Sequence, residues 1–104
     1  MRKTRVIIAD NHSLFRQGLK RVIEQEKNLE VIQEAANGEE ALKLILELKP
    51  DALLMDMNLP KDGPEFTREI KEKHPDVEVI VFNVQTVAPA IATLRELPQK
   101  MQIL

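Results

Sequence analysis

The chain has 104 residues, which allow one small domain with one hydrophobic core but leave no room for a second domain. Its 15 basic and 17 acidic residues nearly cancel, so no strong electric field would attract the protein to nucleic acid or to a membrane surface. Cysteine is absent, which excludes disulfide bonds and thiolate metal sites. We therefore expect one domain over residues 1–104, located in the cytoplasm, with no direct contact with nucleic acid or a membrane.

The first predicted element is an apolar run at residues 6–9 that ends in Asp10. A run without internal polar residues predicts a strand that is buried on both faces of a parallel sheet. Apolar residues recur at helical spacing over residues 14–23 and predict a helix there. Ser13, directly before it, is a residue type that can cap its N-terminus. We expect this helix to end near Lys27.

The second strand and helix follow the same plan. Residues 29–36 predict a short strand, after which Asn37 and Glu40 form a capping-box pattern that begins a second helix. Turn-forming residues at 49–51 end that helix and precede another apolar run, residues 52–56, whose last member is again an aspartate. Strand and helix therefore continue to alternate.

The third helix and fourth strand lie beyond a loop. Residues 58–64 have the composition of a turn, and Phe66 and Ile70 mark the inward face of a helix that ends at residues 74–75. Residues 77–82 form the most β-prone stretch of the chain. They predict a strand.

A fourth helix is expected over residues 87–97, where Pro89 is tolerated because it lies in the first turn. Residues 101–104 can begin a fifth strand. This order predicts an α/β fold with a doubly wound parallel sheet and right-handed crossovers. Ligands bind such sheets outside the carboxyl ends of the strands, which is where we expect Asp10 and Asp56.

Four blocks of sequence add to the strand pattern. They are Val6-Ile7-Ile8-Ala9-Asp10-Asn11-His12-Ser13-Leu14-Phe15-Arg16-Gln17-Gly18-Leu19, Ala35-Ala36-Asn37-Gly38-Glu39-Glu40-Ala41-Leu42, Leu54-Met55-Asp56-Met57-Asn58-Leu59-Pro60 and Asp62-Gly63. In this order the chain resembles the receiver domain of two-component response regulators, in the subgroup of the LuxR/FixJ type. The resemblance implies a flavodoxin-like strand order of 2-1-3-4-5, in a C-terminally truncated and partly degenerate chain that lacks the last helix.

The resemblance also implies a phosphorylation site. In the family, the aspartate at the position of Asp56 accepts a phosphoryl group from a sensor histidine kinase, with Mg²⁺ beside it. The implied metal ligands are Asp10, Asn11, Asp56 and the backbone carbonyl of Asn58. Because a carboxylate is ionised at neutral pH, Asp56 needs a cation rather than a general base to act as a nucleophile. The resemblance therefore implies a signalling switch and not a metabolic enzyme. Such a switch normally regulates transcription through an output domain, which we expect to be absent from residues 1–104.

Three residues depart from the family pattern. Asn11 replaces the second of two adjacent acids, so weaker Mg²⁺ binding is expected. Asn83 replaces a Ser or Thr that senses the phosphoryl group, although its amide can still donate a hydrogen bond to that group. The family's phosphate-site lysine falls past Leu104, and Lys100 would lie at the wrong end of the fifth strand.

These departures leave a second interpretation open, in which the chain is a pseudo-receiver that works as a protein-interaction or dimerisation module without phosphorylation. A missing last helix would expose apolar sheet surface, which predicts self-association through residues 87–104. A plainer explanation is a shortened or degenerate gene product whose tail has no role.

Other classes of protein are disfavoured. A phosphatase with an aspartyl intermediate would need a second acid at Asn58, and a flavin-binding protein would need aromatic residues to stack on the ring. The simplest alternative for Asp10 and Asp56 is that each opens a turn after a strand. His12 and His74 stand alone near helix ends, and we interpret them as surface or capping residues.

Overall fold

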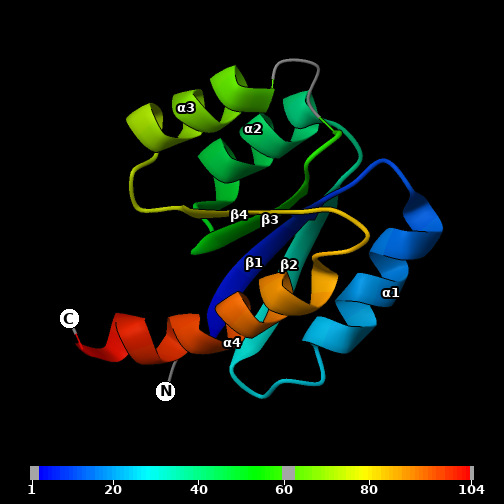
Figure 1. Ribbon diagram of the computed structural model, residues 1–104. Helices are drawn as coiled ribbons and strands as arrows, with labels where there is room; N and C mark the ends of the chain where they lie inside the picture. Colours follow the sequence, from blue (N-terminus) through cyan, green and yellow to red (C-terminus); the bar gives the residue numbers. More distant parts are fainter. Residues whose placement is uncertain (1–2, 60–62, 104) are drawn as a thin grey trace.

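The computed structural model describes residues 3–59 and 63–103, and Figure 1 shows a sheet with helices on both faces. The elements in chain order are β1 (Thr4–Ala9), α1 (Ser13–Ile23), β2 (Leu29–Ala35), α2 (Gly38–Leu48), β3 (Ala52–Asp56), α3 (Gly63–Lys73), β4 (Glu78–Phe82) and α4 (Val87–Ile103). The four strands are parallel and lie in the order β2-β1-β3-β4. The predicted α/β class and the order of the first four strands are confirmed.

The central strand β1 explains why the apolar runs are unbroken. Its alternate residues belong to two separate cores, one on each face of the sheet. Val6 and Ile8 pack with buried residues of α1 and α4, whereas Ile7 and Ala9 pack with buried residues of α2 and α3. All four are fully buried. The helices therefore cover the sheet in pairs, as Figure 1 shows.

Helix α2 begins as the sequence predicts. The side-chain oxygen of Asn37 accepts a hydrogen bond from the backbone N–H of Glu40 at 2.8 Å, and the Glu40 carboxylate accepts one from the N–H of Ala36 at 3.3 Å. The helix ends at Lys49, whose φ of 48° lies in the left-handed region that normally favours glycine. These two ends set the path of the chain into β3.

Helix α1 differs from the prediction at both ends. His12, and not Ser13, occupies the N-cap, because the N–H of His12 already bonds the Asp10 carboxylate and this turn starts the helix one residue earlier. Ser13 is the first helical residue, so its predicted capping role is wrong. The helix ends at Ile23, and turns lead from there past Lys27.

The predicted fifth strand is wrong for Met101–Ile103, because α4 runs without a break to Ile103. Helix-forming residue types follow Pro98, no glycine ends the helix, and three residues are fewer than a typical strand. Lys100 accordingly lies within α4, and Leu104 lies outside the described residues. Of the helices that the structure describes, none is long and apolar enough to cross a membrane.

Candidate functional site

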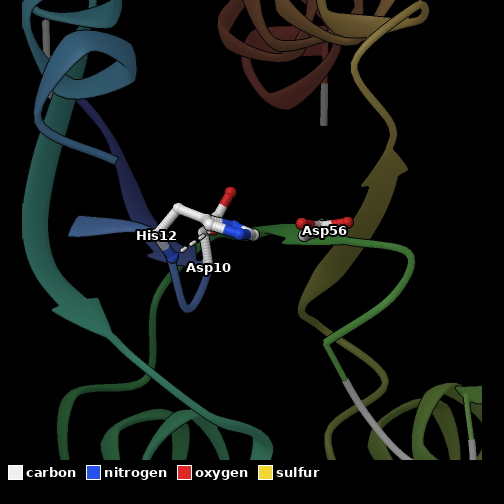
Figure 2. A group of neighbouring side chains, drawn as sticks. All are labelled: Asp10, His12 and Asp56. Carbon is white, nitrogen blue, oxygen red and sulfur yellow. Dashed lines mark hydrogen bonds and ion pairs between the residues drawn. The ribbon is translucent and has the colours of Figure 1, made fainter. Parts of the chain in front are cut away.

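The candidate site lies at the carboxyl ends of β1 and β3. These strands are neighbours, and Ala9 stands opposite Met55 in their register. Asp10 directly follows Ala9, and Asp56 is the last residue of β3, so both carboxylates reach the same edge of the sheet. Figure 2 shows their side chains beside that of His12, and one ligand atom from each of these three residues lies within 4.8 Å of the others.

Asp10 is the buried member of this group, with 1% of its surface exposed. Its Oδ1 atom accepts a hydrogen bond from the backbone N–H of His12 at 2.7 Å and lies 3.2 Å from the imidazole Nδ1 of the same residue. Its Oδ2 atom is buried and has no hydrogen-bond partner in the part of the chain that the structure describes.

A buried oxygen in this state is costly, because a carboxylate that has lost its water needs a donor or a cation in exchange. The group of Asp10, His12 and Asp56, which we call the acid pocket, therefore fits a divalent ion. Asp10, Asp56 and the backbone carbonyl of Asn58 offer oxygen atoms, which are the ligands that Mg²⁺ prefers.

Asp56 is half-buried, and the loop after it is held by backbone contacts. Its Oδ1 atom accepts a hydrogen bond from the N–H of Asn58 at 3.0 Å. The N–H of Met57 donates to the carbonyl of Phe82 at 2.8 Å, and this bond ties the loop to the end of β4. Asn58 itself is exposed, as is Asn11 beside Asp10.

Asn83 lies just after β4, half-buried, and faces the same loop. Its amide oxygen accepts hydrogen bonds from the backbone N–H groups of Gln85 at 2.8 Å and Thr86 at 3.0 Å. Its amide nitrogen donates to the sulfur of Met57 at 3.4 Å. The oxygen end is therefore used to start α4, and the donor end points toward the residue that follows Asp56.

Arg16 is a contributor that the sequence did not reveal. Its guanidinium donates Nη1–H to the carbonyl of Asp10 and Nε–H to the Glu34 carboxylate at 3.0 Å, which joins α1 to the ends of β1 and β2. The local sequence identifies no partner for it, because a basic residue near a helix N-terminus opposes the helix dipole without indicating which acid or carbonyl it contacts.

His12 is exposed, as expected of a surface residue, with 73% of its side chain accessible. The contact of its ring with Asp10 was not expected. Its side chain makes no capping bond to α1, so the ring is free to face the carboxylates. The path of the loop after β1 places the His12 ring beside Asp10, and the local sequence does not determine that path.

Comparisons with known proteins agree with this geometry. The profile of the family described as "Response regulator receiver domain" matches residues 6–100. The chain is 41% identical over 83 residues to the transcriptional regulatory protein DegU of Brevibacillus brevis, an alignment that covers 79% of this chain and 35% of that protein. It is 42% identical over 81 residues to the response regulator GacA of Pseudomonas viridiflava, covering 77% of this chain and 38% of that one. The chain thus spans little more than a third of the length of these relatives.

A solved structure shows the same fold. The LuxR-family two-component response regulator from Aurantimonas sp. SI85-9A1 superposes with a TM-score of 0.73 at 30% identity, and the match covers 88% of this chain and 69% of that one. The arrangement of strands is therefore shared with this LuxR-family response regulator, in agreement with the resemblance that the sequence blocks indicated.

Proposed function

Because the chain belongs to the response regulator receiver domain family, we propose that it is a signalling receiver in which Asp56 accepts a phosphoryl group from a sensor histidine kinase. The family is a signalling domain rather than a class of metabolic enzymes, and its members bind Mg²⁺ at an acidic pocket. The observation that carries the proposal is the buried, unpaired Oδ2 atom of Asp10 beside Asp56. A cation in the pocket would satisfy that atom.

The chemistry asks little of the protein beyond positioning and charge. An oxygen of Asp56 forms a bond to phosphorus while the bond from phosphorus to the donor's imidazole nitrogen breaks, and that electron pair stays on the imidazole. The N–H of Asn58 holds the other carboxylate oxygen at 3.0 Å and so limits rotation of the nucleophile. Asp10, Asn11, Asp56 and the backbone carbonyl of Asn58 would hold Mg²⁺, which would supply positive charge to offset that of the transferring group.

Asn83 is the proposed phosphoryl-sensing residue. Two backbone N–H groups hold its amide oxygen, so the amide nitrogen is the end that remains available to the site. Its present acceptor is a thioether sulfur, which is a weak one, and a phosphoryl oxygen would compete well for the same donor. The exchange would loosen the contact between Asn83 and Met57.

The partners and the setting follow from the same proposal. The kinase is the phosphoryl donor, and the cytoplasm is the proposed compartment. DegU and GacA are named as regulators, DegU as a transcriptional one, so we infer that the phosphorylated state of this chain serves control of transcription. Contact with nucleic acid is not proposed for residues 1–104.

Phosphorylation of Asp56 can be tested directly. The protein is incubated with Mg²⁺ and acetyl phosphate, and its intact mass is measured. We expect one phosphoryl adduct in the parent chain and none in Asp56→Ala. Asp76→Ala is the matched control, because Asp76 is exposed and lies outside the acid pocket. An adduct that survives in Asp56→Ala, or that never forms at any Mg²⁺ concentration, would refute the proposal.

A second candidate function is interaction without phosphorylation, and one surface favours it. An apolar groove of about 480 Å³ runs between α1 and α4. It is lined by Leu14, Phe15, Gly18, Leu19, Val22, Val87 and Ile91. Leu14 is 83% exposed in this groove, which is costly for a leucine in water. The expected exposure of the sheet on this face is wrong, because buried residues of α4 pack there together with those of α1. Val87 and Ile91 instead line the groove, so we propose that residues 87–104 support self-association through it.

A further inference from the structure

The imidazole of His12 gives the acid pocket a nitrogen ligand. Its Nδ1 atom lies 3.2 Å from Oδ1 of Asp10, and one ligand atom each from Asp10, His12 and Asp56 fall within 4.8 Å of one another. Ligands that share one ion at Zn²⁺-type distances lie about 3 to 3.5 Å apart. The His12 side chain is 73% exposed, so it has space to rotate toward such a spacing.

The unpaired Oδ2 atom of Asp10 is an independent sign that the pocket takes a ligand. It is buried, and the N–H and the ring of His12 both contact the other oxygen of the same carboxylate. A histidine contact alone is explained by a hydrogen bond. It does not explain why the second oxygen is withdrawn from water and faces no donor among the described residues.

The ligand types favour one class of ion over another. Mg²⁺ takes oxygen atoms almost exclusively, whereas imidazole suits Zn²⁺, Ni²⁺ and related first-row transition metals. The chain has an amide at Asn11, which carries no charge to attract a hard cation. His12 supplies a softer donor next to it, with its ring directed at the carboxylates (Figure 2).

We propose that His12 is the third ligand, with Asp10 and Asp56, of a site for divalent first-row transition metals such as Co²⁺, Ni²⁺ and Zn²⁺. The proposal shares the acid pocket with the proposed receiver function and in that sense rests on it, but it does not depend on phosphoryl transfer. The two carboxylates also offset the positive end of α1, which would otherwise disfavour a cation at this place.

The test is a metal titration of the untagged protein without any phosphodonor. Co²⁺ and Mg²⁺ are titrated separately by calorimetry into the parent chain and into His12→Gln. Loss of the nitrogen ligand should lower the association constant for Co²⁺ at least about tenfold and that for Mg²⁺ by a much smaller factor. His74→Gln is the matched control, because His74 is the other of the two histidines and lies outside the group.

A second readout does not depend on the variant. Paramagnetic Co²⁺ should shift and broaden the imidazole resonances of His12 at metal concentrations that leave those of His74 unchanged. Circular dichroism of His12→Gln checks that the fold is kept. Equal Co²⁺ constants in the parent and His12→Gln, with equal broadening of both histidines, would reduce the contact to a structural hydrogen bond and overturn the inference.

The two proposals fail separately in these experiments. Absence of an adduct on Asp56 would refute phosphoryl transfer and leave the Co²⁺ titration standing. Loss of any difference between His12→Gln and His74→Gln would refute the nitrogen ligand, even with Asp56 phosphorylated.

Discussion

At the scale of single residues, Asp10 is notable because its buried carboxylate has an oxygen without a hydrogen-bond partner among the described residues. Arrangements of this kind are kept where a ligand makes use of them, since the unpaired atom itself destabilises the fold. Because the unpaired oxygen lowers the free energy of unfolding, we expect the stability of Asp10 variants to reveal whether an ion binds in the acid pocket.

Replacing Asp10 by Asn tests this cost. The amide keeps an acceptor for the N–H of His12 but removes the buried charge. Without metal, the free energy of unfolding of Asp10→Asn should therefore equal that of the parent or exceed it by up to about 2 kcal/mol. Added Mg²⁺ should raise the melting temperature of the parent and leave that of the variant unchanged. Urea unfolding with a chelator and with Mg²⁺ measures both effects.

The control for this experiment is Asp76→Asn, an exposed aspartate outside the pocket, which should respond to Mg²⁺ as the parent does. A variant that loses stability without metal would mean that the Asp10 charge is compensated by something other than a cation.

The residue scale also shows where sequence reasoning stops. The approach of Asp10 and Asp56 could be predicted, because both follow apolar runs and parallel strands end at one edge. The roles of Asn11, Asn58 and Asn83 in metal binding and sensing stay predictions. His12 and Arg16 could not be placed, because their partners depend on how the loop after β1 turns and on which side of α1 faces β2.

At the scale of elements, short-range signals predicted helix starts better than helix ends. The Asn37–Glu40 pattern acts within four residues, and the structure confirms it. The end of α4 has no such signal, because neither a glycine nor a proline follows Pro98 in the sequence. The predicted strand is wrong over Met101–Ile103 for that reason, since these few residues carry no strand preference strong enough to stop a helix.

Lys49 offers a test at this scale. It ends α2 with φ at 48°, a conformation that strains any side chain with a Cβ atom and suits glycine. Lys49→Gly should therefore raise the free energy of unfolding by about 0.5 to 1 kcal/mol, after allowing for the greater entropy of unfolded glycine.

Urea denaturation measures this change, and Lys43→Gly in the interior of α2 provides the control. Glycine there should destabilise the protein by about 1 kcal/mol, because the backbone is helical. A loss of stability in both variants would show that the Lys49 side chain makes contacts that stabilise the fold by more than its backbone strain destabilises it.

At the scale of the whole molecule, the two faces of the sheet are not covered alike. On one face, buried residues of α3 such as Phe66 and Ile70 pack in one core with buried residues of α2. On the other face, an apolar groove lies between α1 and α4. Phe15, which lines the groove, stacks on Phe82 with ring centroids 6.0 Å apart. A second copy of the chain is the occupant that we propose.

Light scattering over a dilution series tests that occupant. We expect a mass above that of the monomer at high protein concentration, which Leu14→Glu should return to the monomer value because the charge cannot be buried in the groove. Leu46→Glu is the control, since Leu46 is 66% exposed on α2, which belongs to the other face. A parent mass equal to the monomer throughout would refute self-association.

His12 is the N-cap of α1, and the groove residues Leu14 and Phe15 lie in the first turn of the same helix. Whatever moves one group as a rigid body moves the other, so any energetic coupling between the ion and the second copy must act equally in both directions. A favourable coupling predicts that a chelator added during purification weakens the proposed oligomer, and that a concentrated sample retains the proposed ion more firmly than a dilute one.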